Sequence, residues 1–169
     1  NRAYNVEFFP LPEPMILGEA TRVMSLRDGT KKMSKSDESE YSRIHIDDDP
    51  DTIRLKLQKA KSDMAEGISY DVEKRPEASN LLTIYAAVAG KGIKDAAAEC
   101  AGMNFSTFKK TLAEMLIAHF DPIRLQMEKL LGDTGYIDTI LRDGAEKASA
   151  IAEPVLKQTK DIVGLYRPE

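Results

Sequence analysis

A short run of lysines and serines is the part of the chain best suited to chemistry. Residues 31–37 (KKMSKSD), called the lysine loop below, follow the turn at Asp28-Gly29. The loop offers ammonium groups, hydroxyls and backbone N–H groups, and each charge-assisted hydrogen bond to a phosphate oxygen contributes about 1.5 to 3 kcal/mol. Lysine suits a phosphate that moves during a reaction, because its long stem lets the charge follow the group. The composition therefore predicts a polyphosphate site, with a solvated polar loop as the alternative.

Other basic side chains are candidate contacts for the phosphates of a nucleic acid, with a solvated helix face as the alternative. These candidates are Arg54, Lys56, Lys59, Lys61, Lys109 and Lys110. The acidic run Asp47–Asp49 precedes Pro50, and carboxylates are favoured where a helix begins. Because this run lacks the spacing of a calcium loop, we predict helix capping there and no metal site.

The overall composition is that of an ordinary globular protein. Of the 169 residues, 42% are hydrophobic and 31% are charged, and 24 Lys and Arg against 28 Asp and Glu give a net charge of -4. This acidity argues against a protein that coats nucleic acid indiscriminately. No apolar run approaches the roughly 18 residues that span a bilayer, and the layout of a signal peptide is absent. We therefore expect a soluble cytoplasmic protein, in which the single Cys100 forms no internal disulfide.

Short strands are predicted around the lysine loop. Met15–Leu17 and Arg22–Leu26 are apolar or β-branched runs, and Arg43–Ile46 is the only later segment of this kind. So few strands cannot complete a sheet, which predicts the remnant of a larger one. The chain starts without Met and has three prolines within residues 10–14. We expect a piece of a longer protein, and a processed whole domain is the alternative.

From Pro50 onward the apolar residues recur with the period of helices. The first predicted helix, residues 50–64, has Ile53, Leu57, Ala60 and Met64 on one face. Ser79 or Asn80 caps the next, which Gly90 closes. Others follow over residues 93–101, over residues 105–132 with a kink or restart near Asp121 caused by Pro122, and over residues 145–163. In the last helix we expect one face to point into the core, and this face carries Ala148, Ala152, Val155, Thr159 and Ile162. Short links favour an antiparallel bundle, so the predicted fold class is mainly α.

Residues 32–36 (KMSKS) match letter for letter the second signature of class I aminoacyl-tRNA synthetases. Five specified residues recur by chance on the order of once in a million positions. The chain also resembles the bacterial tryptophanyl-tRNA synthetases over about residues 9–165, most clearly in the segments 47–53, 68–71, 75–85 and 143–148. The related tyrosyl enzymes diverge after the lysine loop, so residues 79–82 favour tryptophan. Glu77 departs from the family pattern, which usually has a small residue there.

The resemblance implies three parts. Residues 1–46 would end a Rossmann-type α/β catalytic domain, residues 47–78 would connect, and residues 79–169 would form the helical domain that binds the tRNA anticodon. The whole protein would be a ligase that condenses tryptophan with ATP to tryptophanyl-adenylate and passes the tryptophanyl group to its tRNA. The resemblance also implies Mg²⁺ with the ATP, a homodimer and no membrane partner.

The resemblance also implies roles for individual residues. Lys32 and Lys35 would be catalytic, neutralising the leaving pyrophosphate, and the backbone of Val23 or Met24 would contact the adenine. The complete set implied for ATP binding is Val23, Met24, Lys32, Met33, Ser34, Lys35 and Ser36. The basic side chains named above would be candidates for contacts with the tRNA.

One signature of the resembled family is absent from the sequence. It requires two histidines three residues apart, and the only histidines here are His45 and His119. We therefore expect the 169-residue chain to be inactive in amino-acid activation by itself. The rival hypothesis is a non-catalytic helical adaptor that binds RNA or protein and carries the lysine loop by chance.

Overall fold

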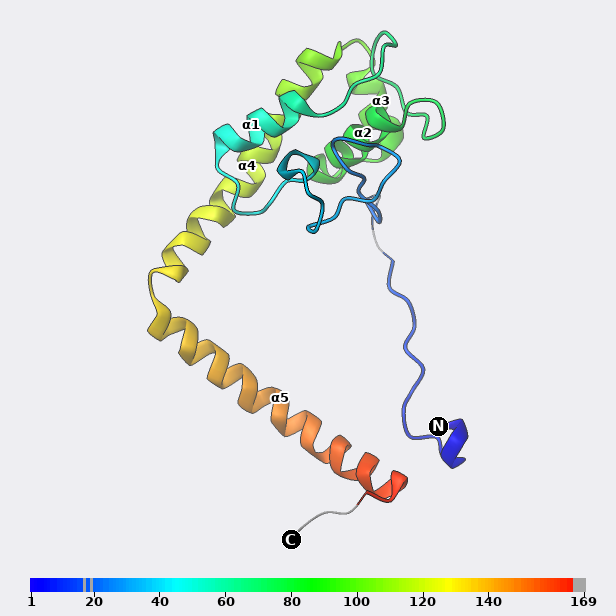
Figure 1. The fold of residues 1–169 in the computed structure, drawn as a ribbon, viewed down its shortest axis with the longest axis vertical. Helices are drawn as coiled ribbons and strands as arrows, with labels where there is room; N and C mark the ends of the chain where they lie inside the picture. The colour runs from blue at the N-terminus through cyan, green and yellow to red at the C-terminus, as the bar shows by residue number, and fades with distance from the viewer. Residues whose placement is uncertain (17, 19, 166–169) are drawn as a thin grey trace. The chain divides into compact units, whose positions relative to one another are not determined.

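The structure is a computed structural model that describes residues 1–16, 18 and 20–165 (Figure 1). These residues are mainly helical, which confirms the predicted fold class. They form two short 3₁₀ helices, Arg2–Tyr4 and Glu40–Ser42, and the α-helices α1 (Pro50–Lys59), α2 (Pro76–Ala89), α3 (Ile93–Cys100), α4 (Phe105–Leu131) and α5 (Thr134–Val163). None of the helices in this described part combines the length and apolarity needed to cross a membrane.

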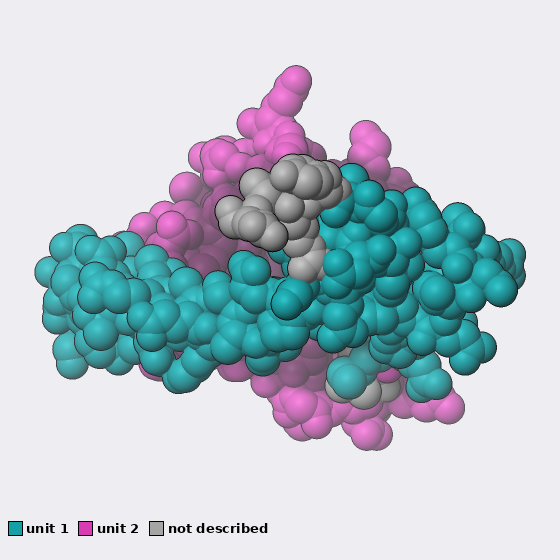
Figure 2. Space-filling view, turned by 90° about the horizontal axis from the view of Figure 1, so that it is seen from below, with its two compact units in different colours: residues 1–15, 128–169 teal, residues 16–127 magenta. Residues whose placement is uncertain are grey.

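The chain divides into two compact units (Figure 2). One is Ile16–Met127, and the other combines Asn1–Met15 with Glu128–Glu169. The boundaries predicted after residues 46 and 78 both fall inside the first unit. The three-part division by function therefore stays a prediction.

A single hydrophobic core fills the unit Ile16–Met127, where the apolar faces of α1 to α4 meet. Its largest side chains are at most 2% exposed: Ile53, Leu57, Leu81, Leu82, Phe108, Leu112 and Leu116. Burying a side chain of this size contributes about 1.5 to 3 kcal/mol. Leu26, just before the lysine loop, belongs to the same core and is 2% exposed. The base of the loop is thus fixed to the helices by apolar packing.

The strands predicted around the lysine loop do not form. Among the described residues, β-pairing is limited to one antiparallel bridge between Met24 and Lys32. Met15 and Ile16 lie outside any strand and are 83% and 75% exposed, and Leu17 is outside the described residues. Arg43–Ile46 is also irregular. Two or three extended residues do not make a stable sheet without further partners, and the described residues supply none.

Helix α1 begins as predicted but ends before residue 64. Ala60 adopts an extended conformation, with φ -56° and ψ 142°. The next N–H group, that of Lys61, donates to the carbonyl of Leu26 at 2.7 Å instead of continuing the helix. Met64 is consequently fully exposed, and the prediction that it shares the buried face is wrong.

Helix α2 begins at Pro76 rather than at Ser79 or Asn80. Proline is well suited to the first turn, because its fixed φ matches the helix and its missing N–H has no helical partner there. Ser79 and Asn80 are therefore buried in the first half of the helix instead of capping it. Gly90 ends α2 in the left-handed conformation, with φ 63°, as predicted.

The two long helices also differ from expectation. Helix α4 continues through Pro122, so of the predicted kink or restart near Asp121 the restart does not occur. Helix α5 begins at Thr134, because the Asp133 side chain accepts a hydrogen bond from the Tyr136 N–H group at 3.0 Å. None of its residues is buried, so the prediction of an inward-facing apolar stripe is wrong for this structure. Its predicted end at Gly164 is confirmed.

Candidate functional site

The lysine loop begins from a short antiparallel ladder. The Ser25 N–H donates to the carbonyl of Lys31 at 2.7 Å, and the Met33 N–H donates to the carbonyl of Val23 at 3.0 Å. Between these two bonds, Met24 is bridged to Lys32. The ladder therefore fixes the backbone from which the Lys32 side chain extends.

The rest of the loop is a turn whose cationic side chains reach solvent. The Asp37 N–H donates to the carbonyl of Ser34 at 3.3 Å, and the Ser36 N–H donates to Ser34 Oγ at 3.2 Å. The side chains of Lys32 and Lys35 are exposed, and no described residue pairs with either ammonium group. Both ammonium groups are therefore available to an anionic ligand.

The turn before the loop is seated directly against the start of α2. Asp28 accepts hydrogen bonds from the Thr30 hydroxyl at 2.6 Å and the Thr30 N–H at 3.1 Å, and these bonds lower the pKa of Asp28. A Cβ atom at Gly29 would lie 2.6 Å from the carbonyl carbon of Pro76. Only glycine fits this approach, so any side chain at position 29 would push the loop away from α2.

A buried arginine holds the segment after the loop. The Arg43 guanidinium donates to the carbonyls of Asp37 at 2.9 Å and Ser39 at 3.3 Å, and it pairs with Glu40. Its Nε–H donates to His45 Nε2 at 2.8 Å. Sequence reasoning missed Arg43, because only the fold brings its side chain to these acceptors.

Asn80 of α2 holds the segment before the loop, and its role was also missed. Its Oδ1 accepts from the Met24 N–H at 2.8 Å, and its Nδ2 donates to the Met24 carbonyl at 2.8 Å and to the Ser25 carbonyl at 3.4 Å. The side chain is buried, with 5% of Asn80 exposed. A polar amide beside the apolar run Leu81–Ala89 was the available signal, and it was interpreted as a helix cap.

Most of the other candidate cations are already paired. Arg54 Nε donates to Glu114 Oε1 at 2.8 Å, which raises the pKa of Arg54. Lys61 pairs with Glu77 at 2.8 Å, which raises the pKa of Lys61. The ammonium group of Lys59 lies 4.1 Å from the centre of the Tyr41 ring.

Two of these cations are buried, so the alternative of a solvated helix face is wrong for them. Lys56 is 4% exposed, and its ammonium group lies 2.6 and 2.8 Å from the two carboxylate oxygens of Asp48. Lys109 is 8% exposed and donates to the carbonyls of Ala60 and, at 3.5 Å, Gln58. Burial without a carboxylate partner lowers the pKa of Lys109. Both side chains tie elements together within the fold.

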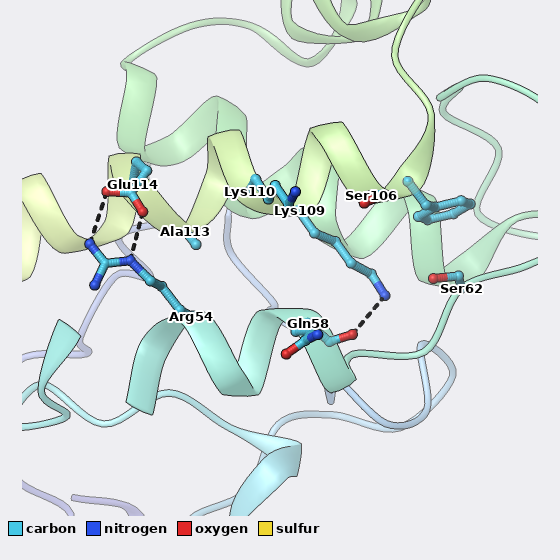
Figure 3. Close-up of a pocket in the computed structure, with 9 residues that line it drawn as sticks. Arg54, Gln58, Ser62, Ser106, Lys109, Lys110, Ala113 and Glu114 are labelled. Atoms are coloured by element: carbon cyan, nitrogen blue, oxygen red, sulfur yellow. Dashed lines mark hydrogen bonds and ion pairs between the residues drawn. The ribbon is translucent and has the colours of Figure 1, made fainter. Parts of the chain in front are cut away.

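A pocket of about 720 Å³ lies between α1 and α4 (Figure 3). It brings together Arg54, Lys109 and Lys110, three of the residues that the sequence nominated for nucleic-acid contacts. The ring of Phe105 and the hydroxyls of Ser62 and Ser106 also line it. Lys59 and Lys61 are not among its lining residues, and neither is any residue of the lysine loop.

The acidic run before α1 acts within the fold. Asp49 caps α1 by accepting from the N–H groups of Asp51 at 2.9 Å and Thr52 at 3.0 Å, and hydrogen bonds from Thr52 lower the pKa of Asp49. Asp48 pairs with Lys56. Over residues 1–16, 18 and 20–165, no group of three or more His, Cys, Asp or Glu side chains is arranged to hold a metal ion.

Curated relatives share sequence with nearly all of the chain. It is 51% identical over 160 residues to the tryptophan–tRNA ligase of Brucella melitensis, an alignment that covers 93% of this chain and 45% of the relative. It is 44% identical over 158 residues to the tryptophan–tRNA ligase of a Nostoc species, covering 94% and 47%. The chain thus spans about half the length of the curated relatives it matches.

Solved structures share the fold. The tryptophanyl-tRNA synthetase of Mycoplasma pneumoniae matches with a TM-score of 0.77 and 23% identity, over 98% of this chain and 49% of that one. The Campylobacter jejuni enzyme complexed with ADP and tryptophan matches with a TM-score of 0.61 and 25% identity, over 85% and 44%. The family model described as "tRNA synthetases class I (W and Y)" matches residues 1–121. Because this match covers more than half of the chain, the chain belongs to the class I tRNA synthetases of the tryptophan and tyrosine family.

Proposed function

We propose that the whole protein joins tryptophan to its tRNA, and that this chain supplies the lysine loop of the ATP site. The free ammonium groups of Lys32 and Lys35, on a loop whose two ends are held in place, are the observation that carries the proposal. The choice of tryptophan rests on similarity to the tryptophan–tRNA ligases of Brucella melitensis and Nostoc.

In the proposed first step, a carboxylate oxygen of tryptophan attacks the α-phosphorus of ATP. A new P–O bond forms, the bond to the pyrophosphate oxygen breaks, and the electron pair leaves with pyrophosphate. Negative charge therefore grows on the oxygens that face the lysine loop. Lys32 and Lys35 neutralise this charge, and preorganised donors of this kind are typically worth about 2.7 to 4 kcal/mol of barrier. In the second step, a ribose hydroxyl oxygen of the tRNA attacks the carbonyl carbon of the adenylate and forms the ester bond. The bond from that carbon to the AMP phosphate oxygen breaks, and the hydroxyl proton passes to the departing AMP phosphate.

The remaining nucleotide contacts are proposed from the same geometry. Met33 is half-buried against the core and anchors the loop, while Ser34 and Ser36 present hydroxyls to the phosphates. The backbone N–H and carbonyl groups of Met24 are bonded to Asn80. The N–H of Val23 has no described acceptor, so it is the group we assign to the adenine.

Mg²⁺ is expected to arrive with ATP. The described residues provide no cluster of carboxylates that would form a protein cage for it. We therefore assign the ion to the ATP phosphates, and we derive no step that depends on a protein-bound metal.

The test of this proposal is tryptophan-dependent exchange between ATP and pyrophosphate in the whole protein. Lys35→Ala should lower the exchange rate by roughly 10² to 10³ without lowering the unfolding midpoint, because no described residue pairs with the Lys35 ammonium group. Lys94→Ala removes an equally exposed lysine from α3 and should leave the rate unchanged. A Lys35→Ala protein with the wild-type rate would contradict the proposal. No exchange by the wild type would favour the helical adaptor.

The pocket between α1 and α4 is the proposed contact with tRNA. It presents Lys110, exposed and without a described partner, next to the Phe105 ring, on which an unpaired base could stack. Lys110→Ala should raise the KM for tRNA while leaving ATP–pyrophosphate exchange unchanged. Equal effects of Lys110→Ala on tRNA charging and on ATP–pyrophosphate exchange would exclude this role.

The proposal also includes a location and an oligomeric state. We propose that the protein acts in the cytoplasm, where ATP and tRNA are available as substrates, and that it forms a homodimer.

A further inference from the structure

Asn80 bonds to the backbone far outside its own helix. Its side-chain amide forms hydrogen bonds with both the N–H and the carbonyl of Met24, although 56 residues separate Asn80 from Met24 along the chain. The neighbouring polar side chains of α2 behave differently. Thr83 Oγ1 donates to the Ser79 carbonyl within the helix, and Ser79 Oγ accepts from the Asp71 N–H just before it. Among these three buried residues, Asn80 alone reaches the segment that carries the lysine loop.

The bonds of Asn80 satisfy the two polar backbone groups of Met24, which the short antiparallel ladder leaves without a partner. Ser25 and Val23, on either side of Met24, bond to Lys31 and Met33, while Met24 itself turns its polar groups toward Asn80. A primary amide offers one acceptor and two donors, so it can pair with a backbone N–H and a backbone carbonyl together. Without Asn80, both groups of Met24 would lack their partner at a half-buried position, which is unfavourable.

We propose that Asn80 is a positioning residue for the ATP site, holding the Val23–Met24 backbone at the adenine and setting the register of Met24 against Lys32. This inference rests on the proposed function, because it takes the segment beside the lysine loop to be part of the nucleotide site. Asn80 touches no ligand itself. Its contribution reaches the nucleotide through the backbone of Met24.

The inference predicts that ATP binding and the rate of the chemical step depend on different residues of the site. The Val23–Met24 segment contacts the nucleotide equally before and during the reaction, so loosening it weakens binding without slowing chemistry. Lys35 acts on the charge that grows during the reaction, so its loss lowers kcat instead. Two residues of one site should therefore change different kinetic constants.

The experiment compares Asn80→Asp with Ser79→Ala in the whole protein, measuring ATP affinity by calorimetry and ATP–pyrophosphate exchange. Asn80→Asp keeps the acceptor for the Met24 N–H and removes the donor to the Met24 carbonyl. Losing that bond should raise the Kd and the KM for ATP about tenfold, with kcat and the KM for tryptophan within about twofold of wild type. Ser79→Ala removes the hydrogen bond between another buried side chain of the same helix and the Asp71 N–H, and it should leave all four constants unchanged.

Each outcome supports or overturns one statement. An unchanged ATP affinity in Asn80→Asp, or the same increase in Ser79→Ala, would overturn the inference. A wild type that binds ATP and gives no exchange would overturn the proposed function, while the Kd values would still decide the role of Asn80. If Asn80→Asp does not fold, Asn80→Ser is measured, and amide exchange at Met24 in the wild type supplies a further test. Fast exchange of that amide in the absence of nucleotide would show that the Asn80 bond is not maintained.

Discussion

The lysine loop and helix α1 carry the same kind of side chain and use it in opposite ways. On the loop, Lys32 and Lys35 are exposed and have no described partner. On α1, Arg54 pairs with Glu114 and Lys56 is buried against Asp48. The difference lies in the neighbours and not in the residue type. Sequence composition alone therefore could not separate the cations that stabilise the fold from those that are available to a ligand.

This comparison has an energetic basis. A buried cation is tolerated only with a partner that replaces its hydration, and removing that partner is strongly unfavourable. An exposed cation contributes little to stability and keeps its charge for a ligand. Substitution of the buried Lys56 should therefore lower stability, and substitution of Lys32 or Lys35 should lower activity, with little overlap between the two effects.

The largest effect on stability is expected for Lys56→Ala. It leaves the Asp48 carboxylate, only 10% exposed, without the ammonium group 2.6 Å away. Breaking one half of a buried pair costs about 3 to 5 kcal/mol. Urea denaturation should report this loss, and Lys59→Ala on the same helix is the matched control, because Lys59 forms an exposed contact with Tyr41 worth at most about 1 kcal/mol. Equal losses in the two variants would break the distinction between buried and exposed cations.

An intermediate effect on stability is expected at low pH, when the Asp63 carboxylate is protonated. Hydrogen bonds from Arg75 hold the pKa of Asp63 below its ordinary value of 3.8. The stabilisation is therefore fully present above that value and is lost as the pH falls through the lower folded-state pKa. Urea midpoints at about pH 7 and pH 3 should differ less for Asp63→Asn than for wild type. The same difference in both proteins would assign the acid sensitivity to other carboxylates.

The smallest effect is expected for Arg54→Ala. Arg54 and Glu114 keep 47% and 61% of their side chains exposed, and ion pairs between exposed side chains contribute little to stability. Added salt should reduce even this contribution, because it screens exposed charges. A loss of stability as large as that of Lys56→Ala, measured by urea denaturation in low salt, would mean that the pair is as important to the fold as Lys56 and Asp48.

Local rules predicted those helix ends that depend on a single residue. The cap at Asp49 and the end of α2 at Gly90 followed from hydrogen-bonding and backbone preferences of single residues. The end of α1 did not, because it depends on a bond from Lys61 to Leu26, far back in the chain. The apolar stripe of α5 has the period of a buried face, but the described residues do not cover it. Periodicity indicates which face of a helix is apolar, but it does not identify the segment that packs against that face.

The candidate site also has a part that the sequence identified and a part that only the fold revealed. The motif KMSKS at residues 32–36 identified the candidate loop, because the residues proposed for its chemistry are consecutive. Its role at the ATP site stays a prediction. The two residues that hold its ends, Asn80 and Arg43, act through contacts that only the fold creates. The tRNA candidates were chosen by charge alone, so they included Lys56 and Lys109, which are buried.

The most direct test of the central claim measures the reactivity of the lysines in the whole protein. Lys32 and Lys35 should be acylated rapidly by an amine-directed reagent, and ATP should protect both, as followed by mass spectrometry of the peptides. Lys94, exposed on α3, should react equally with and without ATP. Unchanged acylation of Lys32 and Lys35 at saturating ATP would contradict the claim that the loop keeps its cations for the nucleotide.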